Sequence, residues 1–119
     1  MNDKKNIAIS LHGITIQTGK ASGIVVHLDS KTKISWSEIN SDHILVIDYP
    51  GGSFLRYLYR AAAIIAEKGS KGIEMAGFLK RYGKPSIFSV SNARYRIIEG
   101  AAIDLDVHDK GADIIIKKK

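Results

Sequence analysis

The sequence predicts an α/β domain with a mixed, mostly parallel sheet, a central β-α-β unit and an antiparallel C-terminal hairpin. Residues 43–47 form a continuous aliphatic run, which is typical of a strand buried on both faces of a parallel sheet. A stretch with helical periodicity follows that run. Near the end of the chain, two strand-like segments flank Asp109-Lys110-Gly111, a sequence that favours a hairpin turn.

The N-terminal third predicts strands. Residues 7–11 place an apolar side chain at every second position, and residues 14–16 continue the pattern, so we expect one or two strands here. Residues 21–30 fit either a strand or a short helix, because Val25-Val26 favours a strand whereas the small residues before it allow a helix. Residues 34–36 fit another short strand.

The clearest unit begins at residues 43–47. Pro50-Gly51-Gly52 ends this strand, because proline cannot donate to a sheet and glycine permits positive φ. Ser53 is a candidate N-cap for a helix that extends to about residue 68, with Gly69 just beyond its C-terminus. Apolar residues form one stripe of that helix at helical spacing: Phe54, Leu58, Ala61 and Ile65. Residues 73–76 predict the next strand, which completes a right-handed β-α-β unit.

The remaining chain predicts short strands. Residues 78–84 have the composition of a basic turn, which Pro85 ends. Strands are then expected at residues 86–90, 94–98, 102–108 and 112–117. One face of the third of these is expected to be buried, because three aliphatic residues alternate there with polar ones: Ile103, Leu105 and Val107.

Length and composition indicate a single domain over residues 1–119. The absence of cysteine excludes disulfides and thiolate sites and fits a reducing compartment. No apolar run is long enough for a secretory signal or a membrane span, so we expect a cytoplasmic protein with no membrane partner. The formal charge is +6, and basic tails at about residues 1–5 and 117–119 carry much of it. The four histidines have no metal-ligand spacing, so neither a metal nor a cofactor is expected.

The Pro50-Gly51-Gly52 segment is the first candidate site. A glycine pair at the carboxyl end of a buried strand, directly before a helix, directs free backbone N–H groups at whatever lies there. Such an arrangement can bind an anion or stabilise an oxyanion. The same residues also fit a tight connection with no chemical role.

Residues 47–53 resemble the Ser-Pro-Gly-Gly-Ser junction of the Clp-protease/crotonase superfamily of serine peptidases. Residues 9–14 are similar to that superfamily's opening strand, and residues 73–77 follow the glycines at a similar distance. Arg94-Tyr95-Arg96, then Gly100-Ala101, then His108 resemble the segment that leads to the catalytic histidine. The resemblance covers roughly residues 7–109.

This resemblance implies a serine hydrolase or peptidase acting on a peptide or acyl substrate. Ser86 would be the nucleophile and His108 the general base. The oxyanion or anion site would be formed by Gly51 and Gly52 together with the amide of Ile87. The superfamily usually forms rings or trimers, which implies a homo-oligomer. A non-catalytic relative that acts in assembly is the alternative within the same resemblance.

A second interpretation is a nucleic-acid-binding protein. Cations and aromatic residues interleave without an acid in two segments, the composition of a surface that contacts phosphates and stacks on bases. Residues 43–77 and the C-terminal strand also resemble Alba-type chromatin proteins. The candidate binding residues are Lys80, Arg81, Tyr82, Lys84, Arg94 and Arg96.

Overall fold

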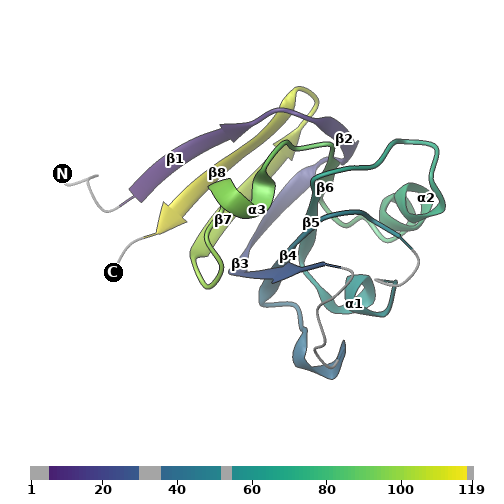
Figure 1. Ribbon diagram of the computed structural model, residues 1–119, viewed down its shortest axis with the longest axis horizontal. Coiled ribbons are helices and arrows are strands. Elements are labelled where there is room, and N and C mark those ends of the chain that lie inside the picture. The colour runs from purple at the N-terminus through teal and green to yellow at the C-terminus, as the bar shows by residue number, and fades with distance from the viewer. Residues whose placement is uncertain (1–5, 30–35, 52–54, 118–119) are drawn as a thin grey trace.

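The computed structural model describes residues 6–29, 36–51 and 55–117. Its strands form one eight-stranded sheet in the order β1-β8-β7-β3-β4-β5-β6-β2 (Figure 1). The strands are β1 (Asn6–Leu11), β2 (Ile14–Gln17), β3 (Gly19–Leu28), β4 (His43–Ile47), β5 (Ala63–Ala66), β6 (Ser86–Phe88), β7 (Ala102–His108) and β8 (Gly111–Lys117). The helices are α1 (Leu55–Arg60), α2 (Glu74–Arg81) and α3 (Ala93–Arg96), with a 3₁₀ turn η2 (Trp36–Glu38) before β4.

The α/β class and the mixed sheet are confirmed, but the mostly parallel arrangement is wrong. Within the described residues, four strand pairs are antiparallel and three are parallel. The parallel pairs are confined to the central stretch β3-β4-β5-β6. A β-α-β unit does lie at the centre, but it consists of β4, α1 and β5. The hairpin of β7 and β8 at Asp109-Lys110 is confirmed.

The long helix expected over residues 53–68 is wrong, because its second half is a strand. Helix α1 ends at Arg60, and Ala63–Ala66 form β5, whose four side chains are all buried. A short aliphatic run fits a buried helix and a buried strand equally well by periodicity. Parallel pairing with β4 determines the outcome here. Ser53 lies outside the described residues. Gly69 follows β5 rather than a helix, and its φ of +121° and the closeness of Pro50 and Phe88 leave no room for a side chain.

Four other segments differ from their predicted form, and the structure decides one choice that the sequence leaves open. The strand expected at residues 73–76 is the start of α2, which also contains most of the stretch interpreted as a basic turn. The strand expected at residues 94–98 is the short helix α3. The ambiguous residues 21–30 lie mainly in β3, a strand. Trp36 begins a 3₁₀ turn, and residues 34–35 lie outside the described residues.

Two apolar cores lie on opposite faces of the central strands. In β4, Ile44 and Val46 face one core while Leu45 and Ile47 face the other. The first core includes the inward residues of β7 and β8 together with Ala93 of α3 and Ile97. The second core includes the buried residues of α1 and α2. Helices α1 and α2 therefore cover one face, and the antiparallel half of the sheet with α3 covers the other (Figure 1).

The sheet is strongly curled, because its two edge strands, β1 and β2, are joined by only His12 and Gly13. The Thr15 hydroxyl of β2 donates to the His108 carbonyl oxygen at the end of β7 (2.7 Å). Gly111 begins β8 with a φ of +144°, and a Cβ there would meet the Leu11 carbonyl oxygen. The antiparallel half thus forms a rigid scaffold behind the parallel strands. Among the described residues, no helix combines the length and apolarity needed to cross a bilayer.

Candidate functional site

A groove of about 590 Å³ lies between the segment after β4 and helix α2, and we call it the α2 groove. It is at the carboxyl ends of the parallel strands β4 and β5, where open α/β sheets usually bind their ligands. The groove is lined by Tyr49, Pro50, Gly51, Ile73, Glu74, Met75, Gly77, Phe78 and Arg81.

Helix α2 supplies one wall of the groove because of its amphipathic pattern. Met75, Ala76 and Leu79 are buried in the second core. The adjoining side of the helix carries Glu74, Phe78 and Arg81, of which Phe78 is half-buried at the margin of that core and the two charged residues are exposed. These three residues follow the spacing i, i+4, i+7, so they occupy one side of the helix. Seven residues rise about 10 Å along a helix axis, so Glu74 and Arg81 stand at opposite ends of the groove.

The N-terminus of α2 adds a polar element. Its N-cap residue is Ile73, which makes no side-chain hydrogen bond to the helix. The first N–H groups of a helix have no partner within the helix and carry a partial positive charge. Glu74 and Arg81 are both exposed, and no hydrogen bond or ion pair joins either side chain to another described residue. The groove therefore presents a guanidinium and a carboxylate that no other described residue engages.

The predicted nucleophile and base make other contacts. Ser86 is fully buried in β6, and its hydroxyl donates to the Lys84 carbonyl oxygen (3.0 Å). His108 lies at the β7–β8 turn, with Nε2 3.3 Å from Asp113 Oδ2. The backbone N–H of Lys110 donates to His108 Nδ1 (3.2 Å). Ser86 and His108 therefore each contact other residues, and no hydrogen bond joins the two within the described chain.

The predicted oxyanion residues also make other contacts. Ile87 lies within β6 and pairs with Ile65 of β5 and Thr15 of β2. Gly51 does line the α2 groove, but its N–H donates to the Tyr49 carbonyl oxygen (2.8 Å). Gly52 lies outside the described residues. An oxyanion hole shared by Gly51 and Ile87 gains no support from these contacts.

The predicted nucleic-acid-binding residues fall into two groups. Lys80, Arg81 and Tyr82 are exposed around the end of α2. The other three make contacts within the protein. Lys84 Nζ donates to the Ala61 carbonyl oxygen (2.7 Å), and partial burial lowers the pKa of this lysine. Arg96 Nη2 donates to the Ser10 carbonyl oxygen (3.1 Å).

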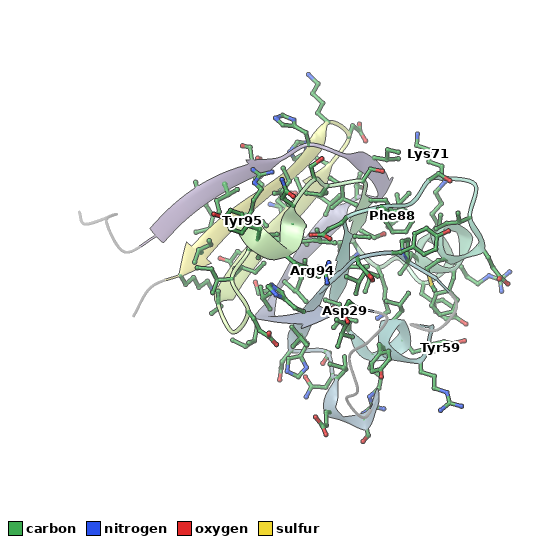
Figure 2. The ribbon with its side chains drawn as sticks, viewed as in Figure 1. Asp29, Tyr59, Lys71, Phe88, Arg94 and Tyr95 are labelled. Atoms are coloured by element: carbon green, nitrogen blue, oxygen red, sulfur yellow. The ribbon has the colours of Figure 1, made fainter. Side chains whose placement is uncertain are left out.

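Arg94, the remaining predicted nucleic-acid-binding residue, lines a second, more polar cavity of about 560 Å³. Its guanidinium lies 3.1 Å from Asp29 Oδ2 and 3.1 Å from Glu67 Oε1 (Figure 2). Its backbone N–H also donates to Glu67 Oε2 (2.9 Å). Within the described ranges, no group of three His, Cys, Asp or Glu side chains could hold a metal ion. Because Arg94 joins Asp29 and Glu67 at this cavity, we interpret these contacts as structural.

The sequence prediction found Gly51 but missed Glu74, Phe78 and Arg81 as a set. The reason is that residues 73–76 were interpreted as a strand, which would separate Glu74 from Arg81 in space. Their spacing along the chain is the signal that identifies one helix face.

The fold is similar to that of several solved structures. A chain of aconitase X from Thermococcus kodakaraensis, in its holo form, is 18% identical with a TM-score of 0.59, and the alignment covers 92% of this chain and 99% of that one. A UPF0107 protein solved by NMR is 15% identical with a TM-score of 0.60 over 95% of this chain and 99% of that one. A muramoyltetrapeptide carboxypeptidase from Oxalobacter formigenes is 12% identical with a TM-score of 0.58 over 98% of this chain and 51% of that one.

At these identities the likenesses concern the fold alone. They do not confirm the resemblance to the Clp-protease/crotonase superfamily. A comparison with curated protein sequences finds no match. The sequence profile of the "PEP-utilising enzyme, mobile domain" family matches residues 39–110. Because this match spans more than half of the chain and includes both walls of the α2 groove, the protein belongs to the PEP-utilising enzyme mobile-domain family.

Proposed function

We propose that this chain is a mobile domain of an enzyme that acts on a small phosphorylated carboxylate of the phosphoenolpyruvate (PEP) class, and that the α2 groove contacts that molecule. The observation that carries the proposal is Arg81, which has no hydrogen bond or ion pair to another described residue and lies in a groove at the carboxyl ends of β4 and β5. The family description, which names PEP-utilising enzymes, supplies the class of substrate.

Three features of the groove suit such a ligand. A guanidinium can bind a phosphate or carboxylate through two parallel hydrogen bonds. The uncapped N-terminus of α2 favours negative charge. Tyr49, Pro50 and Phe78 supply apolar walls for a short carbon skeleton.

Glu74 sets a limit on how much negative charge the groove accepts. Among the described residues that line the groove it is the only acid, and it stands at the end away from Arg81. A carboxylate there repels a second anionic group and can accept a proton from a ligand. The groove is therefore asymmetric, with a cationic end and an acidic end.

The first test is the affinity for PEP, measured by calorimetry at low salt for the wild type and for Arg81→Gln. We expect the substitution to weaken binding about tenfold, which corresponds to the loss of one charge-assisted contact of about 1.4 kcal/mol. Lys80→Gln is the matched control, because Lys80 has the same charge on the same helix but does not line the groove. Equal losses in both variants, or no binding of PEP to the wild type, would contradict the proposal.

Glu74→Gln tests the same site by removing a negative charge, where Arg81→Gln removes a positive one. Removing the carboxylate lowers repulsion of the anion, so we expect PEP to bind about twofold to fivefold more tightly at low salt. Inorganic phosphate serves as the comparison ligand, since it reports the cationic end without a carboxylate. A weaker affinity for PEP in Glu74→Gln would mean that Glu74 contacts the ligand as a hydrogen-bond acceptor, and the repulsion argument would be wrong.

A further inference from the structure

Three aromatic rings form a cluster on the surface beside the α2 groove. Tyr59 of α1 packs edge-on against Phe78 of α2, with ring centroids 4.7 Å apart and an interplanar angle of 88°. Tyr82 lies 4.7 Å from Phe78 and 5.6 Å from Tyr59. We call Tyr59, Phe78 and Tyr82 the aromatic cluster.

The cluster is ordered by its own contacts and yet remains open to solvent. Tyr59 is 52% exposed and Tyr82 is 51% exposed. Partial desolvation and the neighbouring Tyr82 raise the pKa of Tyr59, while Arg81 acts in the opposite direction. Arg81 directly precedes Tyr82 in the chain and lines the groove together with Phe78, so it is beside the cluster. Rings fixed against one another lose little conformational freedom when a partner covers them.

The cluster is continuous with the α2 groove. Phe78 belongs to both, and Arg81 lines the groove while it lies near Tyr59. One face of α2 thus connects the proposed substrate site to an exposed aromatic surface. A chain that covers the cluster would also lie over the mouth of the groove.

The charges around the cluster restrict the partner. Arg56 is exposed and stands one turn before Tyr59 on α1, and Arg81 borders the other side. Among the described residues that line the groove Glu74 is the only acid, and it stands at the end away from Arg81. Two copies of this surface would repel each other, so self-association through it is disfavoured. An apolar centre with an acidic rim is its electrostatic complement.

Protein is favoured over nucleic acid as the covering partner. Stacking of bases requires free ring faces, but Tyr59 packs in edge-to-face geometry with both Phe78 and Tyr82, and Phe78 and Tyr82 are tilted against each other, so the rings partly cover one another. Half-exposed tyrosines beside arginines are typical of the energetic centre of a protein–protein interface.

We infer that the aromatic cluster docks an acidic surface of a partner protein chain, the chain that supplies the rest of the enzyme. This inference rests on the proposed function in one respect, namely that the domain works as part of a larger enzyme. It does not depend on which small molecule the groove binds.

The test uses the full chain with the photo-cross-linking residue p-benzoylphenylalanine in place of Tyr59, expressed in the cells from which the sequence derives. Tyr95 is the matched control position, because it is 86% exposed but belongs to α3 on the other face of the sheet (Figure 2). The cross-linked protein is identified by mass spectrometry and purified. Its affinity is then measured for the wild type, for Tyr59→Ser/Tyr82→Ser and for Tyr95→Ser.

We expect a cross-link from position 59 to one other protein and none from position 95. The double variant should bind that protein at least about tenfold more weakly, and Tyr95→Ser should bind it normally. Binding should also weaken when salt is raised from about 50 to about 300 mM, because the rim contacts are ionic. Circular dichroism checks that the double variant is folded.

Four results would overturn the inference: no cross-link from position 59, an equal cross-link from position 95, a cross-link only to another copy of this chain, or equal affinities of wild type and double variant. A single-stranded oligonucleotide of about 12 residues tests the rival class. Oligonucleotide binding that the double variant loses would assign the cluster to nucleic acid instead. Normal PEP binding by the double variant would leave the proposed function standing if the docking inference failed.

Discussion

At the scale of single residues, Arg94 stabilises the carboxyl-end edge of the sheet through two ion pairs. It joins the segment after β3 to the segment after β5, through Asp29 and Glu67 (Figure 2). Glu67 is only 17% exposed in its side chain, so its charge is partly removed from water. Loss of the guanidinium would leave this carboxylate with the Arg94 backbone N–H as its remaining contact on α3.

We therefore expect Arg94→Gln to lower the free energy of unfolding by about 1–2 kcal/mol in chemical denaturation. Arg96→Gln is the control, because Arg96 is exposed and donates to a single carbonyl oxygen. That substitution should change stability by no more than about 0.5 kcal/mol. Equal destabilisation by both variants would show that the ion pairs of Arg94 add nothing to the free energy of unfolding.

Individual site residues were only partly predictable from the sequence. The sequence identifies Gly51 because a glycine directly after a buried strand permits backbone conformations and close approaches that other residues do not. Gly51 does line the groove. No feature of the neighbouring sequence identifies Glu74 and Arg81 as site residues. Their importance depends on the helix that places them on one side, and that helix was not predicted.

At the scale of elements, the antiparallel half is held by a polar link across three strands. Asp104 of β7 accepts hydrogen bonds from the Ser22 hydroxyl of β3 (2.6 Å) and lies 3.0 Å from Lys117 Nζ of β8. The hydrogen bond from Ser22, followed by the interaction with Lys117, lowers the pKa of Asp104 below its ordinary value of 3.8. The unfolded chain therefore binds a proton at Asp104 at higher pH than the folded protein does.

This shift gives a stability contribution that is present above about pH 3.8 and is lost as the pH falls through the lower folded pKa. We expect Asp104→Asn to destabilise the protein near neutral pH by less than about 1 kcal/mol, because the carboxylate is exposed and screened by solvent. The difference from the wild type should disappear in acid well below pH 3.8. Urea denaturation at the two pH values measures this, and a difference that persists unchanged in acid would disprove the linkage.

Strand prediction succeeded where the pattern has one structural solution. β7 alternates buried and half-buried residues along its whole length, and β4 is buried on both faces. It failed at β5 and α2, where a four-residue apolar window fits a strand and a helix equally well. At β5 the outcome is determined by parallel pairing with β4 and β6, contacts that join residues distant in sequence.

At the scale of the whole molecule, structure and proposed chemistry separate into two halves. The antiparallel strands and α3 enclose the first core, whereas α1 and α2 cover the second. The α2 groove and the aromatic cluster both lie on the α1–α2 side. The proposed substrate site and the proposed docking surface therefore share one face of the molecule.

The expectation of a homo-oligomer stays a prediction of the sequence resemblance. The net charge of +6 is also distributed less simply than the sequence indicates. Lys84, Arg94 and Arg96 make internal contacts, while Arg56 and Arg81 remain exposed on the α1–α2 side. Sequence alone could not separate these groups, because the contacts of each cation depend on tertiary structure.

The most direct measurement of the central claim is an amide chemical-shift map of the ¹⁵N-labelled chain titrated with PEP. The proposed function predicts that the largest shifts occur at Gly51, Glu74 and Gly77, which line the α2 groove. Asn92 and Tyr95, at the second cavity, should be unaffected. Shifts centred on Asn92 and Tyr95, or no saturable shifts at all, would contradict the claim that the α2 groove is the substrate-contacting site.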